Sequence, residues 1–197
     1  MSAPARVLIV QHGDKERNPG DPGLTALGHS QARASASHLA TRRPVALYAS
    51  PQRRALETAE PIARATGLPI RADDRLRERL NWDDAGEQAP EAFLAEWERT
   101  VADRAYVPSR GDSSHAAAAR FREFLQAVNE RHAVGPVVAV THGGVTVDLL
   151  RSLIGDARLR ATAPGVFEHG MPCCGLTALA WEAAGWQVLG VGTLVGI

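Results

Sequence analysis

The chain has 197 residues, of which 45% are hydrophobic and 22% are charged, a composition typical of one globular domain. Lys plus Arg and Asp plus Glu both number 22, so the formal net charge is zero. This balance provides no basic excess for binding nucleic acid or an anionic membrane surface, and no apolar run reaches membrane-spanning length. A single pocket can still be locally positive and take a small anion.

The first residues of the chain and its two cysteines bear on where the protein is expected to reside. Met1 to Ala5 lacks the basic start and the long apolar run of a secretory signal peptide. Cys173 and Cys174 are adjacent, which does not suit a disulfide framework or a zinc site. We therefore expect a cytoplasmic protein.

The hydrophobic pattern predicts strands and helices that alternate along the chain. Strands are expected at Arg6–Val10, Val45–Ala49, about Pro69–Arg71, Pro136–Thr141, Cys174–Trp181 and Trp186–Gly192, the last two as a hairpin around Ala183–Gly185. Helices are expected at Thr25–Thr41, from Ser50-Pro51 to about Thr66, at Pro90–Val101, at Ser114–His132 and from Gly144 to about Ile154. Thr25 and Ser50 are the expected N-caps of the first two helices, and Gly67 the end of the second.

This alternation predicts an α/β fold of three layers, α/β/α, with a mostly parallel sheet. Residues 1–197 are expected to form a single domain, with a small cap or specificity segment at about residues 73–112. In such sheets, ligands bind beyond the carboxyl ends of the strands. Three polar clusters follow predicted strands: Gln11-His12-Gly13, Ser50 to Arg54, and Thr141-His142-Gly143.

Two histidines and an arginine at one sheet edge favour an anion site with phosphoryl-transfer chemistry. A neutral imidazole is a good nucleophile toward phosphorus, cations hold the phosphoryl oxygens, and a carboxylic acid protonates the leaving alcohol. His12 is the candidate nucleophile, and Gly13 would let the backbone approach the phosphoryl group. Arg54 is a candidate bidentate phosphate ligand.

Further motifs follow in an order that resembles the histidine phosphatase superfamily, the phosphoglycerate mutase-like proteins. Val7 to Gly13, V-L-I-V-Q-H-G, is similar to the family's signature strand and R-H-G motif. The other similar segments are Leu24-Thr25 with Gly28 and Gln31-Ala32, Ser50 to Ala55 with Thr58-Ala59, Leu76-Arg77-Glu78, Gly111-Asp112-Ser113, and Thr141 to Val145. The resemblance covers about residues 6 to 150.

The resemblance implies a phosphoglycerate mutase-like fold and a metal-independent phosphatase that forms a phosphohistidine on His12 and needs no cofactor. It implies that Arg54 and His142 bind the phosphoryl oxygens and that Glu78 donates and accepts the proton. The residues expected to contact phosphate or substrate are Gln11, Gly13, Lys15, Asn18, Ser113 and Gly143. The expected substrate is a small phosphorylated metabolite, with no nucleic acid or membrane partner.

One position departs from the family pattern. The arginine before the nucleophile is Gln11 here, which keeps a donor but loses the charge. Our hypothesis is that Lys15, in Q-H-G-D-K, supplies the missing charge. The main alternative is a catalytically impaired module that binds phosphorylated ligands or proteins. A metal-dependent hydrolase, which chelator sensitivity would reveal, has little support.

A mutase is a less favoured alternative, since the middle segment is short and net acidic, although Arg75, Arg77, Arg79 and Arg110 could still face inward.

Some features leave their role open. Trp82 and Trp97 could stack on a substrate ring, but core packing is the favoured interpretation. His115 or His169 could line the site. The loop at residues 161–172 and the cap segment would set specificity. The last strands could lie at a sheet edge and pair with a second copy as a homodimer.

Overall fold

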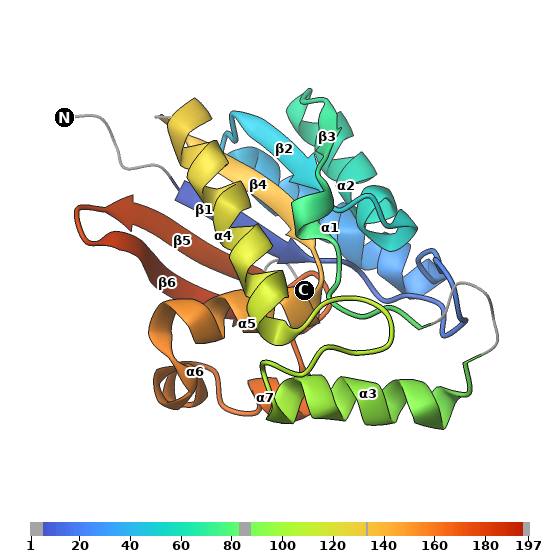
Figure 1. The fold of residues 1–197 in the computed structure, drawn as a ribbon. Helices are drawn as coiled ribbons and strands as arrows, with labels where there is room; N and C mark the ends of the chain where they lie inside the picture. The colour runs from blue at the N-terminus through green and yellow to red at the C-terminus, as the bar shows by residue number, and fades with distance from the viewer. Residues whose placement is uncertain (1–5, 83–87, 133, 195–197) are drawn as a thin grey trace.

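The computed structural model describes residues 6–82, 88–132 and 134–194 (Figure 1). The strands are β1 (Arg6–Gln11), β2 (Ala46–Ala49), β3 (Ile70–Ala72), β4 (Pro136–Thr141), β5 (Leu176–Glu182) and β6 (Gly185–Thr193). The helices are α1 (Ala26–Thr41), α2 (Arg53–Thr66), the 3-10 turn η1 (Asp74–Leu76), α3 (Pro90–Ala102), α4 (Ser114–Arg131), α5 (Gly143–Ile154), α6 (Asp156–Thr162) and α7 (Val166–His169).

These strands form one sheet in the order β3-β2-β4-β1-β5-β6. The first four strands in this order are parallel to one another, whereas β5 is antiparallel to both of its neighbours, β1 and β6. The predicted α/β class is therefore confirmed, with a mixed sheet whose larger part is parallel. The predicted hairpin of β5 and β6 is also confirmed.

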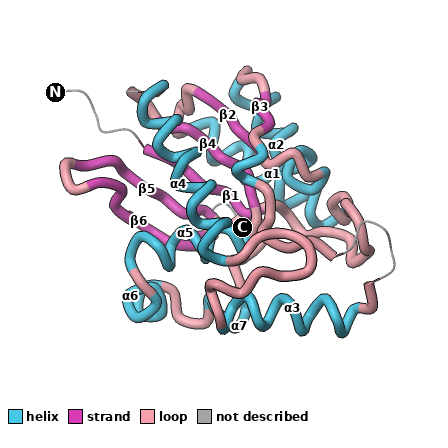
Figure 2. The backbone as a smooth tube through the Cα atoms, viewed as in Figure 1, coloured by secondary structure: helices cyan, strands magenta, loops and turns pink. Residues whose placement is uncertain are grey.

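Two helical layers cover the sheet, as Figures 1 and 2 show. In β2, Leu47 and Ala49 belong to the core cluster formed with α1 and α2, whereas Ala46 and Tyr48 belong to the cluster formed with α4 and α5. Successive side chains of a strand point to opposite faces, so an uninterrupted apolar strand serves both layers. This explains why β2, and β4 as far as Val140, have few polar side chains.

The start of α2 differs from the prediction. Ser50 and Pro51 lie before the helix, which begins at Arg53 with Gln52 as its N-cap. The Ser50 hydroxyl instead shares a hydrogen bond of 2.8 Å with His142 Nε2, a partner that is distant in sequence. The predicted Thr25 cap and the Gly67 end are both confirmed, since Thr25 Oγ1 accepts from Gly28 N and Gly67 has a left-handed φ of 73°.

The segments expected to set specificity contain more helix than predicted. Residues 161–172, expected as a loop, include the end of α6 and all of α7. The segment at 73–112 contains η1 and α3, and Figure 1 shows α3 beyond the carboxyl ends of β1 and β4. Its role as a cap stays a prediction. None of the helices within the described ranges is long and apolar enough to cross a bilayer.

Candidate active site

The register of the central strands brings the two site histidines together. Gln11 at the end of β1 is paired with Thr141 at the end of β4, so the residue after each strand is a histidine. His12 N donates to Thr141 O at 3.0 Å. The rings of His12 and His142 lie 5.2 Å apart between centroids and are inclined by 63°.

His12 is oriented by its own glycine neighbour. Its Nδ1 lies 2.7 Å from Gly13 O, and because a carbonyl only accepts, Nδ1 carries the proton. Nε2 is therefore left with its lone pair, and the Gln11 side-chain amide donates to it at 3.3 Å. A Cβ on Gly13 would lie 2.6 Å from Gly28 O, so the turn requires glycine.

Both imidazoles are held in the neutral form. The pKa of His12 is lowered from 6.5 to about 3, mainly by burial and then by the positive charge of Arg54. Burial and Arg54 also lower the pKa of His142 well below 6.5. His142 is fully buried, and its Nδ1 has no hydrogen-bond partner among the described residues. An uncharged His12 is the form that can attack an electrophile.

Arg54 lies in the first turn of α2 and is only 2% exposed. Its Nη2 donates to Asn81 Oδ1 at 3.2 Å, and its Nη1 lies 3.6 Å from Asp21 Oδ1. Asn81 in turn donates to Gly20 O. Sequence reasoning missed Asp21 and Asn81, since both lie in segments without a periodic pattern and only their approach to Arg54 reveals them.

Glu78 is held at the N-terminus of α5. Its carboxylate accepts from Val145 N and Arg79 N at 2.8 Å and from Gly144 N at 2.9 Å. The N-terminal N–H groups of a helix have no partner within the helix, so they are available to bind an anionic side chain. The Glu78 N–H donates to Gln52 Oε1 at 3.0 Å, which ties this residue to the start of α2.

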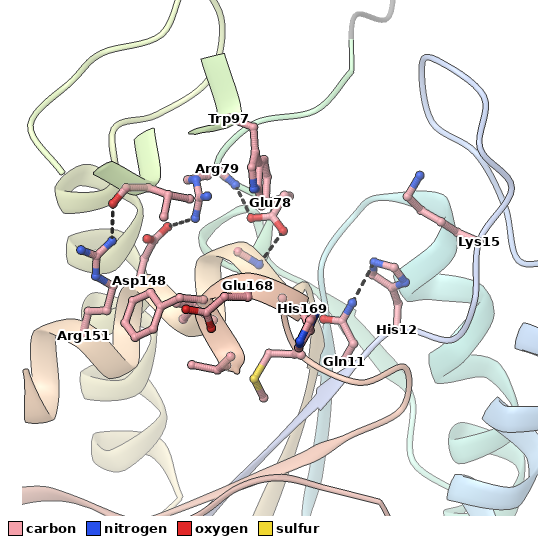
Figure 3. A pocket seen from close by; sticks show the side chains of 18 residues that line it. Gln11, His12, Lys15, Glu78, Arg79, Trp97, Asp148, Arg151, Glu168 and His169 are labelled. Carbon is pink, nitrogen blue, oxygen red and sulfur yellow. Dashed lines mark hydrogen bonds and ion pairs between the residues drawn. The ribbon is translucent and has the colours of Figure 1, made fainter. Parts of the chain in front are cut away.

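A cavity with two lobes joins these groups, and His12, Lys15, Glu78 and Trp97 line both lobes. The inner lobe, about 360 Å³, extends toward α5 and α7 and is drawn in Figure 3. The outer lobe, about 270 Å³, extends toward the loop at residues 18–22 and the aromatic face of α3. The residues that line only the inner lobe include Gln11, Arg79, Gly143, Asp148, Arg151 and His169. Those that line only the outer lobe include Asn18, Arg54, Asn81, Trp82, Phe93 and Leu94.

Lys15 is the second cation at the junction of the lobes. It is partly buried, and burial together with the charges of Arg54 and Arg17 lowers its pKa. Its Nζ donates to Glu16 O at 3.2 Å. In Figure 3 its side chain lies on the same side of the cavity as His12.

Some residues expected at the site lie elsewhere. Ser113 is the N-cap of α4, where its Oγ accepts from Ala116 N, and it lines neither lobe. His115 is exposed and lines neither lobe, whereas His169 lines the inner one. The favoured core packing of Trp82 and Trp97 is wrong, because both rings are half-buried and form cavity walls.

The four arginines of the middle segment have different surroundings. Arg79 lines the inner lobe. Arg77 and Arg110 line a separate hollow, which Glu78 and Arg79 also line. Arg75 pairs with Asp73 at 2.6 Å.

Within the described ranges, no group of three or more His, Cys, Asp or Glu side chains is placed to hold a metal ion.

Comparisons with known proteins agree on one family. The family model for the histidine phosphatase superfamily (branch 1) matches residues 7–193. A glucosyl-3-phosphoglycerate phosphatase of Mycolicibacterium vanbaalenii is 34% identical over 171 residues, which cover 76% of this chain and 74% of that protein. A metal-independent phosphoserine phosphatase of Arabidopsis thaliana is 32% identical over 156 residues, covering 71% and 64% of the two chains. A mycobacterial glucosyl-3-phosphoglycerate phosphatase solved with inorganic phosphate has a TM-score of 0.77 and 29% identity, covering 99% of this chain and 100% of that one.

Proposed function

Because the chain belongs to the histidine phosphatase superfamily and is a phosphatase, we propose that it hydrolyses small phosphomonoesters through a phosphohistidine on His12, without a metal ion. The observation that carries the proposal is the state of His12. Its Nδ1 is bonded to Gly13 O, its ring is neutral, and it lines a cavity shared with a cation and a carboxylate. This is the arrangement that an imidazole nucleophile requires.

In the first step, His12 Nε2 attacks phosphorus and the bond from phosphorus to the ester oxygen breaks. Glu78 in its protonated form gives its proton to the leaving alcohol. In the second step, Glu78 takes a proton from water, which attacks phosphorus and releases inorganic phosphate and neutral His12. The Gln11 amide must leave Nε2 for the attack, and it then has a donor free for a phosphoryl oxygen.

The phosphoryl oxygens would be held by Arg54 and Lys15, with Gly143 and Asn18 on the cavity walls. His142 is fully buried and lines neither lobe, so its part in holding the phosphoryl group is proposed from its place beside His12. Arg54 is oriented by Asp21 and Asn81 before any ligand binds, so little reorganisation is needed in the transition state. The contribution of Gln11 and Lys15 replaces the arginine that the family motif has next to the nucleophile.

The substrate is proposed only as a class, a small phosphorylated metabolite. The named relatives differ, since one is a phosphatase of glucosyl-3-phosphoglycerate and another of phosphoserine. Trp97 lines both lobes, and a leaving group could extend into either one.

A binding module without turnover is the second candidate, and one contact favours it. The Gln11 amide occupies the lone pair of His12 Nε2, the atom that would attack. Such a protein would hold phosphorylated ligands but would form no phosphohistidine.

The test is hydrolysis of p-nitrophenyl phosphate with excess EDTA by the wild type and by His12→Ala, with His115→Ala as the exposed control. We expect activity in the wild type and in His115→Ala, none in His12→Ala, and a protein mass increased by one phosphoryl group after rapid acid quenching of the wild type. Activity abolished by EDTA would replace the proposal with a metal-dependent reaction. Phosphate binding without turnover would favour the binding module.

A further inference from the structure

Three aromatic rings, those of Trp82, Phe93 and Trp97, form a continuous aromatic face on the outer lobe of the cavity. Phe93 and Trp97 lie one turn apart on α3, and Trp82 lies before this helix. The Trp82 and Phe93 rings are stacked, with centroids 6.3 Å apart and planes inclined by 22°, and the Phe93 and Trp97 centroids lie 6.2 Å apart. All three side chains are only half-buried, so a ligand in this lobe can contact them.

Contacts with other groups hold the two tryptophans of the aromatic face in position. Trp82 Nε1 donates to Gln88 O at 2.9 Å. Arg79 lies against the Trp97 ring, with its Cζ 4.0 Å from the ring centroid, a cation–π contact. A side chain that is already ordered loses little conformational freedom when a ligand packs against it. The aromatic face is therefore preorganised for a flat partner.

The aromatic face begins beside the proposed proton donor. A Cβ placed on Gly144 would lie 2.6 Å from both Glu78 Oε1 and the Trp97 ring, so the edge of that ring adjoins the carboxylate. Figure 3 shows these two side chains next to each other. Glu78 would give its proton to the leaving alcohol. A leaving group that extends from the ester oxygen into the outer lobe therefore meets the aromatic face first at Trp97 and then at Phe93.

Charged side chains are distributed unequally between the two lobes. Among the described residues, those on the outer lobe are the ones proposed for phosphoryl binding and proton transfer: Lys15, Arg54 and Glu78. The walls that belong to the inner lobe alone carry further charged side chains, which are Arg79, Asp148, Arg151 and Glu168. Covering charged groups with an apolar ring costs free energy, so an uncharged ring is expected in the outer lobe.

We propose that the outer lobe binds a planar aromatic ring on the leaving alcohol, so that the preferred substrates are phosphate monoesters of alcohols that carry such a ring. The inference rests on the proposed function and names its substrate class. A ring in this lobe gains from the burial of apolar area and, in addition, from stacked or edge-to-face contacts with the aromatic face. Leu94 lines the same lobe and is 56% exposed, so a bound ring would also cover apolar surface that is now in water.

The test compares benzyl, cyclohexylmethyl and methyl phosphate, whose leaving alcohols are of similar acidity. For the wild type we expect kcat/KM for benzyl phosphate to exceed that for methyl phosphate at least about tenfold, because the ring is buried. It should exceed that for cyclohexylmethyl phosphate about three- to tenfold, because only the flat ring can stack on the aromatic face. Equal kcat/KM values for benzyl and methyl phosphate, or for the two ring-bearing esters, would overturn the inference.

Variants assign the preference to one lobe. Phe93→Leu keeps an apolar side chain on α3 but removes the central ring of the aromatic face, so the ratio of kcat/KM for benzyl over cyclohexylmethyl phosphate should fall at least about twofold. Phe167→Leu is the matched control, since Phe167 lines only the inner lobe, and it should keep the wild-type ratio. If Phe93→Leu does not fold, Trp82→Leu removes another ring that lines only the outer lobe, with the same expected result. An unchanged ratio in the folded variant, or a ratio lost in Phe167→Leu, would overturn the inference.

A binding measurement separates this inference from the proposed function. The dissociation constants of benzyl and cyclohexylmethyl phosphate are measured with His12→Ala, which cannot form the phosphohistidine. A preference of about three- to tenfold for benzyl phosphate there supports the aromatic subsite even if the wild type proves inactive toward p-nitrophenyl phosphate. Equal dissociation constants would reject the subsite and leave the proposed hydrolysis untouched.

Discussion

At the scale of single residues, Gln11 stands where the family motif has an arginine, and we propose that Lys15 supplies the missing charge. Gln11 is buried beside the nucleophile and brings no charge. Lys15 brings a charge, and it lines both lobes from the loop that follows β1. The lowered pKa of Lys15 indicates that its ammonium is incompletely solvated and already repelled by Arg54. An anion between Lys15 and Arg54 would relieve that repulsion.

Removal of this charge should therefore weaken catalysis. We expect Lys15→Ala to lower kcat/KM for p-nitrophenyl phosphate about ten- to a hundredfold, the size of one charged hydrogen bond. Gln11→Arg should raise activity, because it restores a charged fork next to His12. Arg17→Ala is the control, since Arg17 is exposed and lines neither lobe. Wild-type values of KM and kcat in Lys15→Ala would show that Lys15 is only a solvated loop residue.

The two buried histidines should make the protein acid-sensitive. The folded-state pKa of His12 is about 3 and that of His142 is well below 6.5, whereas unfolded histidine titrates near 6.5. Between these values the unfolded chain binds more protons, so stability is present above about pH 6.5 and falls as the pH drops toward 3.

Urea unfolding at a series of pH values measures this proton linkage. The slope of the unfolding free energy against pH between 4 and 6 should be smaller in His142→Asn than in the wild type by about one proton. His115→Asn, at an exposed position, should keep the wild-type slope. The same slope in all three proteins would mean that His142 is not held neutral in the folded state.

At the scale of elements, the N-terminus of α5 binds the Glu78 carboxylate through backbone N–H groups. Its first turn has two adjacent glycines, Gly143 and Gly144, and a Cβ on Gly144 would lie 2.6 Å from both Glu78 Oε1 and the Trp97 ring. The glycine is required there by close approach, since no positive φ is involved. The backbone N–H groups can reach the carboxylate because no side chain intervenes.

Gly144→Ala should therefore displace Glu78 with little effect on the phosphoryl-binding groups. We expect kcat for an alkyl phosphate to fall at least about tenfold, because a general acid contributes 10²–10⁴-fold. The loss should be smaller for p-nitrophenyl phosphate, whose leaving group needs little protonation. Gly190→Ala on β6 is the control, since its added Cβ would have only an ordinary contact at 3.9 Å. Equal losses for both substrates would indicate that Glu78 is not the proton donor.

At the scale of the whole molecule, the sheet topology gathers the site from distant segments. β1, β2 and β4 are neighbours in the sheet, so the residues that follow them converge at its carboxyl edge. Glu78 comes from the segment that follows β3 and η1. A ligand bound there connects four segments of the chain. Binding should therefore raise the stability of the whole fold.

Thermal unfolding with and without inorganic phosphate measures this coupling. At a phosphate concentration about 100 times Kd, the wild type should gain about 2.7 kcal/mol, seen as a rise in Tm. The rise should be lost in Arg54→Ala and kept in Arg64→Ala, an exposed arginine on the same helix. For each variant, the Tm with phosphate is compared with the Tm of the same variant without phosphate, so a general loss of stability caused by the substitution cancels. An equal rise in all three proteins would place the anion away from Arg54.

The edge of the sheet formed by β6 is the place where a second copy of the chain is expected to pair. β6 is the last strand in the sheet order, and Leu189 on it is 54% exposed. Unpaired edges of this kind can pair with another chain. Homodimerisation through this edge stays a prediction, as do the single-domain boundary, the cap role of residues 73–112 and the roles of the individual site residues.

The alternating pattern of the chain was sufficient for the fold class, for most element boundaries and for the convergence of His12, Arg54 and His142. These features depend on local periodicity, on turn residues such as Gly67, and on a general rule for parallel sheets. The predicted start of α2 was wrong because a serine at this position can either cap a helix or form a hydrogen bond with a residue that is distant in sequence. Only the position of His142 in the folded chain decides between the two.

Tertiary structure alone decided the surroundings of each charged group. Asp21 and Asn81 orient Arg54, and Asp148 pairs with Arg79. The partners in these contacts are far apart in the sequence, so no local sequence pattern predicts them. Trp82 and Trp97 are aromatic residues of the kind that fill cores, yet both are half-buried and line the cavity, Trp97 from α3 and Trp82 from the segment before it. Which apolar ring faces solvent, and which buried donor lacks a partner, depends on how segments meet in space, and therefore cannot be inferred from neighbours along the chain.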